Sequence, residues 1–329
     1  MENTADDKSE DKWTELVWEN LIYEIVDKKC IPLIGPGAFE RWINLDSITK
    51  TWAEGYHYPY PLEDSSQLPR VSQFLAIQEG DESIPKKTLS RKLRINPPPN
   101  FSSPDLQNTI YAVLADLNLP IYITTNYDHL MEDALRSKGK APSSDFCVWK
   151  ELKDKELKDS ERDPRYTETS YTFNSHSTFS APNDKRPTPA NPLVFHLLGD
   201  IDTPRYMVLT EKDYIDFVIY LSKMGDRYTL PHSIRQTLSN STLLFIGYRL
   251  EDISFLIVFE GFIKLMSPLE GKSIAVQVQM SSKIDPEQKK IIRKYLTKFA
   301  GDLFKIRIYW GDPDDFLKEL RKRWLMVPQ

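Results

Sequence analysis

Short apolar runs alternate along this chain with longer segments that carry apolar residues at helical spacing. The short runs predict buried strands, over residues 30–34, 120–124, 193–198, 242–246, 273–278 and 304–309. The longer segments predict helices, over residues 13–29, 105–118, 127–137, 211–222, 233–240, 251–265, 286–299 and 313–324. Apolar strands that alternate with helices are covered on both faces. We therefore expect an α/β fold with a doubly wound, mainly parallel, Rossmann-like sheet.

Three segments fall outside this alternation. Residues 40–104 are rich in aromatic, proline and charged residues, and they are expected to form a helical lid insertion. Residues 139–191 contain a nearly all-charged stretch and a Ser/Thr/Asn/Pro-rich stretch, so they are expected to form a polar, partly disordered surface excursion. Residues 1–12 form an acidic tail, and residues 13–329 are expected to form one domain that contains both insertions.

Four segments at the ends of predicted strands carry residues suited to nucleotide chemistry. They are Leu-Ile-Gly-Pro-Gly-Ala at 33–38, Ile-Thr-Thr-Asn-Tyr-Asp at 123–128, Phe-His-Leu-Leu-Gly-Asp at 195–200 and Phe-Ile-Gly-Tyr-Arg-Leu-Glu-Asp at 245–252. An open parallel sheet places ligand-binding residues at the carboxyl ends of its strands. Glycines let the backbone approach a pyrophosphate, while Asn, Asp and His side chains suit a ribose and its glycosidic bond. Together the segments predict a nucleotide site with a reactive centre.

Each of these segments also has an ordinary structural interpretation. The Gly35-Pro36-Gly37 loop is either a phosphate loop or a tight turn, because Glu40 stands where a dinucleotide fingerprint has its third glycine. Asn126 and Asp128 are either site residues or helix caps. His196 lies within an apolar run, so it is either a catalyst or a hydrogen-bonded core residue.

Two later strand ends offer further candidates. Gly247 permits close approach by a ligand beside Tyr248, and Arg249 is placed to meet a phosphate. Asp312 follows the strand over residues 304–309 and precedes a proline at a helix start. Adenine contact and a plain turn with a helix cap are both open for Asp312.

Composition and charge exclude several classes of protein. With 329 residues and 40% hydrophobic content, the chain can bury a substantial core. The formal net charge of -5 gives no general attraction to nucleic acid or anionic lipid, so neither is an expected partner. The longest apolar stretch, residues 255–266, is too short and too charged to span a bilayer. The acidic N-terminus does not have the pattern of a signal or transit peptide.

The cysteine content sets limits of its own. Two cysteines, Cys30 and Cys147, are too few for a disulfide scaffold or a four-thiolate zinc site. Such usage suits a reducing cytosol. We therefore expect a cytoplasmic protein without a bound metal.

The order of the motifs resembles that of the SIR2 (sirtuin-like) superfamily, in particular its bacterial NAD-cleaving effectors of anti-phage defence. Residues Gly35 to Ala38 match the family's glycine-rich loop, Thr124 to Asp128 match its Thr-x-Asn-x-Asp segment, and His196 matches its catalytic histidine. Residues 209–214 and 245–252 also resemble the bacterial branch. The resemblance spans roughly residues 21–315.

This resemblance implies roles for individual residues. Asn126 would position the nicotinamide ribose or the attacking water, and His196 would hold the ribose hydroxyls or act as a base. Asp128 would recognise the carboxamide or orient the substrate. The residues expected to bind NAD are Gly35, Gly37, Ala38, Thr125, Asp128, Gly247, Tyr248, Arg249 and Asp312.

The chain departs from the family pattern in three ways. Sirtuin deacylases carry a structural zinc module of four cysteines, which two cysteines cannot build. The family's histidine normally stands in a His-Gly pair, whereas here Gly199 follows His196 by three residues. The separation of 70 residues between Asn126 and His196 is also long. The missing cysteines argue against protein deacylation.

The sequence thus favours an NAD+ glycohydrolase that releases nicotinamide and ADP-ribose, with NAD as its substrate. The resemblance implies an abortive-infection effector, restrained through a HerA-like ATPase, an Argonaute-like protein or self-association. The alternatives are a non-catalytic module that senses NAD or ADP-ribose, and a zinc-free deacylase. The lid's aromatic side chains indicate either a homo-oligomer interface or local packing. They are Trp42, Trp52, Tyr56, Tyr58 and Tyr60.

Overall fold

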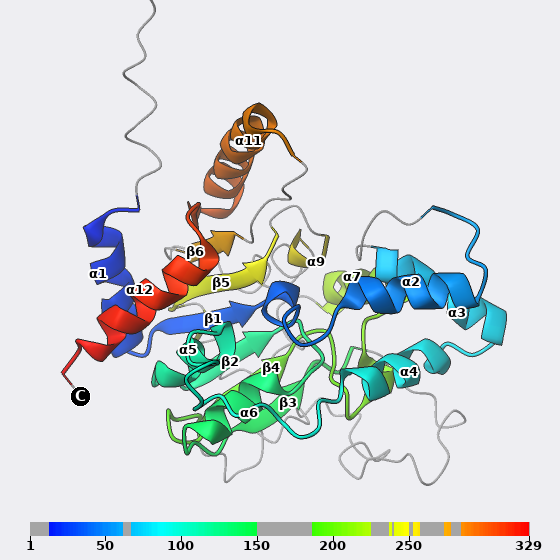
Figure 1. The fold of residues 1–329 in the computed structure, drawn as a ribbon, viewed down its shortest axis with the longest axis horizontal. Helices are drawn as coiled ribbons and strands as arrows, with labels where there is room; N and C mark the ends of the chain where they lie inside the picture. The colour runs from blue at the N-terminus through cyan, green and yellow to red at the C-terminus, as the bar shows by residue number, and fades with distance from the viewer. Residues whose placement is uncertain are drawn as a thin grey trace, which may run out of the picture.

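The computed structural model describes residues 13–61, 67–149, 186–224, 237–238, 240–249, 253–256, 273–277 and 284–328. A seven-stranded sheet forms the centre of this part of the chain, and every neighbouring pair of strands runs parallel (Figure 1). Its strands are β1 (Cys30–Ile34), β2 (Ile121–Thr124), β3 (Ser143–Phe146), β4 (Leu193–His196), β5 (Thr242–Tyr248), β6 (Ser273–Gln277) and β7 (Ile306–Tyr309). The predicted parallel α/β sheet is confirmed.

The strand order explains where a ligand site belongs. The strands follow the order β3-β4-β2-β1-β5-β6-β7, so β2, β3 and β4 all lie on one side of β1, and the chain then crosses to β5 on the other side. Such a reversal opens a crevice at the carboxyl ends of the two strands where it occurs, here β1 and β5. The register brings the ends of four strands into one row, through Ile246, Ile34, Thr124 and His196.

Helices cover both faces of the sheet. One face packs against α1 (Glu15–Val26), α5 (Ile110–Asp116), α6 (Leu130–Ser137) and α12 (Pro313–Leu325). The other face packs against α7 (Glu211–Met224), α9 (Ile253–Leu256) and α11 (Pro286–Phe304). Along β1, Cys30 and Ile34 enter the first core, whereas Ile31 and Leu33 enter the second. Two cores explain why the strands are apolar at successive positions.

The insertion over residues 40–104 is helical, as predicted. Its helices α2 (Leu45–Gly55), α3 (Leu68–Glu79) and α4 (Ser83–Leu93) lie beyond the carboxyl ends of the strands (Figure 1). On α4, Lys86 forms a buried ion pair of 2.6 Å with Asp213 on α7, and Asp213 also accepts the backbone N–H of Thr210. This buried pair anchors the lid to the sheet domain.

The aromatic residues of the lid differ in their surroundings. Trp52 is buried, and Trp42 packs against Phe101 and Tyr111. Tyr58 packs against Phe74 and also contacts the 66% exposed Tyr60. Local packing therefore accounts for Trp42, Trp52 and Tyr58. The prediction that Trp52 lies at an interface is wrong, because its ring is buried.

Three local predictions are wrong. The structure adds an edge strand, β3, inside the expected polar excursion. The helix expected over residues 105–118 begins only at Ile110, and Thr109 caps it, since the Thr109 hydroxyl accepts the N–H of Ala112. The helix expected from residue 127 begins at Leu130, because the preceding residues form the turn that leaves β2.

Other predictions concern residues that lie outside the described part of the chain. They are the tail 1–12, residues 150–185 of the excursion, and most of the helices expected over 233–240 and 251–265. Both cysteines are buried free thiols. Within the described ranges, no helix has the length and apolar content needed to cross a membrane.

Candidate active site

Two glycines, one after β1 and one near the end of β5, pack against each other at the base of the crevice between these strands. A Cβ atom added to Gly35 would lie 2.6 Å from the Gly247 carbonyl oxygen and 2.7 Å from the Tyr248 ring. Gly247 has a φ of +78°, and a Cβ there would lie 2.9 Å from the Ala38 nitrogen. Both glycines are needed for the close approach of the two loops, whether or not a ligand also contacts them.

The glycine loop continues into a single 3-10 turn, η1 (Pro36–Ala38), closed by the Ala38 N–H on the Gly35 carbonyl at 3.1 Å. Beside it lies a cavity of about 190 Å³. Its lining includes Gly37, Ala38, Trp42, Thr109 and Lys318. The cavity leaves space for a ligand next to the loop. The phosphate-loop role of Gly35, Gly37 and Ala38 stays a prediction.

Asn126 follows β2 and its amide is held in one orientation. The Nδ2 group donates to the Gly35 carbonyl at 3.0 Å and to the Tyr111 hydroxyl at 3.1 Å. These two bonds use both amide hydrogens. No group among the described residues donates to Oδ1, although Asn126 is only 7% exposed. Asn126 therefore presents a fixed, unused acceptor at the carboxyl edge of β2.

Thr125 and Tyr248 connect the ends of three neighbouring strands. The Thr125 hydroxyl lies 3.1 Å from the Tyr248 hydroxyl, and both groups reach the carbonyl oxygen of Ile34. Burial raises the pKa of Tyr248, so its hydroxyl stays protonated. These side chains brace the crevice, and their predicted contact with NAD stays a prediction.

Asp128 serves the cap role that was open from the sequence. Its Oδ1 accepts the N–H of Leu130 at 2.9 Å, at the start of α6, and lies 3.5 Å from the Tyr111 hydroxyl. Burial raises the pKa of Asp128 to about 6. The carboxyl group is therefore part of the network around Asn126 as well as a cap.

His196 ends β4 fully buried, and both of its ring nitrogens are engaged. Nδ1 lies 2.9 Å from the Asn126 carbonyl oxygen, and Nε2 lies 2.9 Å from Oε1 of Glu132 on α6. Both partners are acceptors, so the ring carries two protons. Burial lowers the pKa of His196, but the Glu132 carboxylate outweighs it and raises the pKa to about 9.

This environment revises the role expected for His196. A fully buried imidazolium with two donated protons has no free nitrogen to act as a base, and it does not reach the surface to hold a ribose hydroxyl. Of the two interpretations open from the sequence, the environment of His196 is that of a hydrogen-bonded core residue. Through the Asn126 carbonyl, however, His196 fixes the turn that carries the catalytic candidate.

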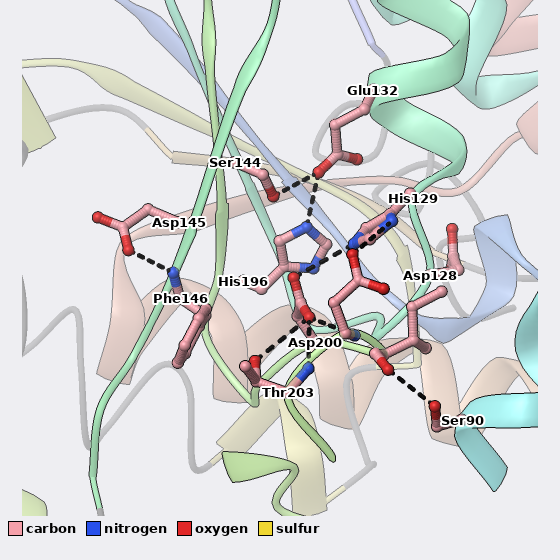
Figure 2. Close-up of polar contacts among 12 residues, drawn as sticks. Ser90, Asp128, His129, Glu132, Ser144, Asp145, Phe146, His196, Asp200 and Thr203 are labelled. Atoms are coloured by element: carbon pink, nitrogen blue, oxygen red, sulfur yellow. Dashed lines mark hydrogen bonds and ion pairs between the residues drawn. The ribbon is translucent and has the colours of Figure 1, made fainter. Parts of the chain in front are cut away.

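Three polar residues of this cluster were not among the predicted site residues, although Asp200 ends one of the four segments singled out in the sequence. They are Glu132, His129 and Asp200, which Figure 2 shows around the His196 ring. His129 lies with its ring centroid 5.7 Å from that of His196, and its Nε2 lies 3.2 Å from Asp200 Oδ2. Glu132 stands at a buried position of an otherwise apolar helix face, which is a signal that the sequence contains.

The two remaining candidates follow β5 and β7. Arg249 follows β5, is half-buried, and forms no ion pair with the described residues. Asp312 caps α12, because its Oδ1 accepts the N–H groups of Asp314 and Asp315 at 2.8 and 3.4 Å. Asp312 is therefore a helix cap, and the contacts of Arg249 and Asp312 with NAD stay predictions.

Some of these side chains are also of the type that ligates metals. His129, Glu132 and His196 place one ligand atom each within 4.8 Å of one another, and His129, Asp200 and Asp202 do the same. In the first group, hydrogen bonds to protein already engage both nitrogens of His196. The expectation of a metal-free site stays a prediction.

A seven-stranded parallel sheet whose strand order reverses between β1 and β5 defines the class of doubly wound α/β folds. The model of the SIR2-like domain family matches residues 120–300, which is more than half of the chain. The chain belongs to this family.

One relative of this chain is named for an enzymatic activity. The NAD(+) hydrolase ThsA of Cytobacillus dafuensis is 23% identical over 223 residues, which make up 66% of this chain and 34% of that protein. The chain thus spans about a third of the length of this relative.

Proposed function

We propose that this chain is an NAD+ hydrolase that releases nicotinamide and ADP-ribose. The observation that carries the proposal is Asn126, whose amide is locked by Gly35 and Tyr111 so that Oδ1 is left as a free acceptor. It lies beside the switch point of a SIR2-like domain. Support also comes from the name of the relative, an NAD(+) hydrolase.

The chemistry asks little of the protein apart from positioning and electrostatic support. Nicotinamide leaves from a cationic ring, so its departure from the ribose C1′ needs no acid. The protein must hold the ribose and a water molecule while positive charge develops on the sugar. A fixed amide oxygen is suited to accept a hydrogen bond from that water or from a ribose hydroxyl.

The cellular role belongs to the same proposal. Unrestrained loss of NAD would harm the cell that makes the enzyme, so we propose an anti-phage effector that acts only when triggered. A HerA-like ATPase, an Argonaute-like protein or self-association would supply the trigger. The test is NAD+ turnover by the purified chain, alone and together with the product of its neighbouring gene, with its oligomeric state measured in parallel.

The first variant to test is Asn126→Ala. We expect the NAD+ cleavage rate to fall by about 10²–10³-fold, the usual cost of removing one group that stabilises a transition state. Chromatography of nicotinamide and ADP-ribose measures the rate, and circular dichroism confirms the fold. Asn118→Ala is the matched control, because Asn118 precedes β2 at the opposite edge of the sheet.

The outcomes separate the rival functions. If the wild type cleaves NAD+ and Asn126→Ala cleaves it at the same rate, Asn126 has no part in the mechanism. Tight binding of NAD+ or ADP-ribose without any cleavage would support the sensing module instead. Formation of O-acyl-ADP-ribose from an acylated peptide would support a deacylase.

A further inference from the structure

His129 lies in the turn that follows Asn126, and its imidazole is partly exposed. Among the described residues, the histidines are His57, His129 and His196. His57 lies at the end of α2 in the lid, and His196 is fully buried with both nitrogens engaged. The His129 side chain is 25% exposed and lies three residues after Asn126. Among these three histidines, only His129 lies beside the cluster with a ring that is partly open to solvent.

The ring of His129 is arranged as half of a histidine–aspartate pair. Its Nε2 lies 3.2 Å from Asp200 Oδ2, so Nε2 carries the proton of this hydrogen bond. Its Nδ1 lies 3.8 Å from Asp202 Oδ2, which is beyond hydrogen-bond distance. No described group bonds to Nδ1, and the neutral ring can accept a proton there.

The pair is not explained by local structure. His129 occupies the N-cap position of α6 but makes no cap hydrogen bond, because the Asp128 carboxylate takes the Leu130 N–H instead. The helix therefore does not need the imidazole. Figure 2 shows the His129 ring beside that of His196, with the Asp200 carboxylate directed toward it.

The aspartate of the pair is held rigidly. Gly199 has a φ of +88°, and any Cβ there would lie 2.4 Å from the Tyr206 carbonyl oxygen. Asp200 Oδ1 accepts the N–H groups of Asp202 and Thr203 at 2.6 and 3.1 Å, which leaves Oδ2 for His129. This is the arrangement in which a carboxylate orients an imidazole for proton transfer.

The lid also contacts this loop. On α4, Ser90 Oγ donates to the Ile201 carbonyl at 2.7 Å, and Arg94 beyond the helix donates to the same oxygen at 3.1 Å. Arg94 also pairs with Asp202 at 2.6 Å. The loop that carries Asp200 is thus pinned between the sheet and the lid.

We propose that His129, oriented by Asp200, is the general base of this site, and the proposal rests on the proposed NAD+ hydrolysis. The bond between C1′ and the nicotinamide nitrogen breaks, and its electron pair leaves with neutral nicotinamide. The water oxygen bonds to C1′, and its proton passes to Nδ1 of His129. Asp200 stabilises the resulting imidazolium, which then releases the proton to solvent.

The groups that face His129 fix the expected pH dependence. They are Asp200, Asp202, Glu132, His196, Asp128 in the same turn and Asp133 in the first turn of α6. Burial lowers the pKa of His129, but the Asp200 hydrogen bond and the Glu132 carboxylate outweigh it and raise the pKa above 6.5. A base must be unprotonated, so kcat should fall as the pH drops through that raised value. Without the Asp200 charge, this acid limb should move to lower pH.

The test compares His129→Gln, His129→Ala, Asp200→Asn and His196→Gln in the NAD+ cleavage assay. We expect His129→Gln to lower kcat by about 100-fold with little change in KM, and to lose the acid limb. Added imidazole should restore part of the rate of His129→Ala, since that site is open to solvent, but not that of His196→Gln. Asp200→Asn should lower kcat and shift the limb.

Controls come from the same molecule. His57→Gln changes a histidine of the lid, and Asp116→Asn changes a half-buried carboxylate at the end of α5 that pairs with Lys138. Both should retain wild-type kcat. Thermal unfolding of each variant confirms that the fold is intact.

Two outcomes are distinct. Wild-type kcat and an unchanged pH profile in His129→Gln, with Asn126→Ala inactive, would overturn the role of His129 and leave NAD+ hydrolysis standing. No NAD+ cleavage by the wild type in any assembly state would overturn the proposed function and this inference with it.

Discussion

Two histidine–carboxylate pairs lie side by side at the carboxyl edge of the sheet, and water reaches them very differently. The His196–Glu132 pair is sealed, with side-chain exposures of 0% and 1%. The His129–Asp200 pair has exposures of 25% and 8%. The same two kinds of side chain thus meet in two solvent environments, 5.7 Å apart between ring centroids.

The difference shows that burial gives two similar histidine–carboxylate pairs different roles. In the sealed pair both ring nitrogens donate to protein, so the pair can only hold the Asn126 turn in place. In the open pair one nitrogen is tied to Asp200 and the other is free. Chemistry with a substrate requires the second arrangement, and rigidity of the site is served by the first.

The largest expected contrast is in stability. Glu132→Gln leaves a buried imidazolium without its counter-charge, so we expect the free energy of unfolding to fall by about 3–5 kcal/mol. Asp200→Asn disturbs a pair that is partly open to water, and the expected loss is about 1 kcal/mol. Urea unfolding at pH 7 measures both values, with Asp133→Asn as the control.

Equal losses in the two variants would remove the distinction between the pairs. A further check is the double variant with Glu132→Gln and His196→Gln. Because it removes both charges together, it should recover part of the stability that Glu132→Gln loses.

A smaller effect concerns pH. The pKa of His196 in the folded protein is raised to about 9 from 6.5, mainly because Glu132 outweighs the opposing effect of burial. The folded state then binds the extra proton between these values. Its stabilising effect is complete below pH 6.5 and is lost as the pH rises through 9. The free energy of unfolding should fall by up to about 1.4 kcal/mol per pH unit in this window.

His196→Gln provides the control for this pH dependence. Its free energy of unfolding should vary less between pH 6.5 and 9 than that of the wild type. The window lies above the raised pKa of Asp128, which is about 6, so that carboxyl contributes little to the slope. Identical slopes in the two proteins would show that His196 is not the group that titrates.

Much of the fold was readable in the sequence because the strands are apolar on both faces. The same strands set the register that brings Asn126 and His196 together, although 70 residues separate them. The edge strand β3 was not predicted because Ser143–Phe146 is short and three of its four residues are polar, and its pairing with β4 is a tertiary contact.

The site was less predictable, since burial decides what each polar residue does. An apolar run around His196 is compatible with either a catalyst or a core residue, and only the partners Glu132 and Asn126 decide. The glycines of the crevice pack against each other across 212 positions, from Gly35 to Gly247, which no local pattern reveals. Glu132 on a buried helix face was the sequence signal that was overlooked.

The most direct test of the division between the two pairs is nuclear magnetic resonance of the histidine ring nitrogens, recorded against pH and with added NAD+. The His→Gln variants assign the signals. We predict that His196 keeps both nitrogens protonated between pH 6 and 8 and does not respond to NAD+, whereas His129 titrates with a pKa above 6.5 and shifts when NAD+ binds. A neutral His196 that responds to NAD+, beside a His129 that does not, would contradict it.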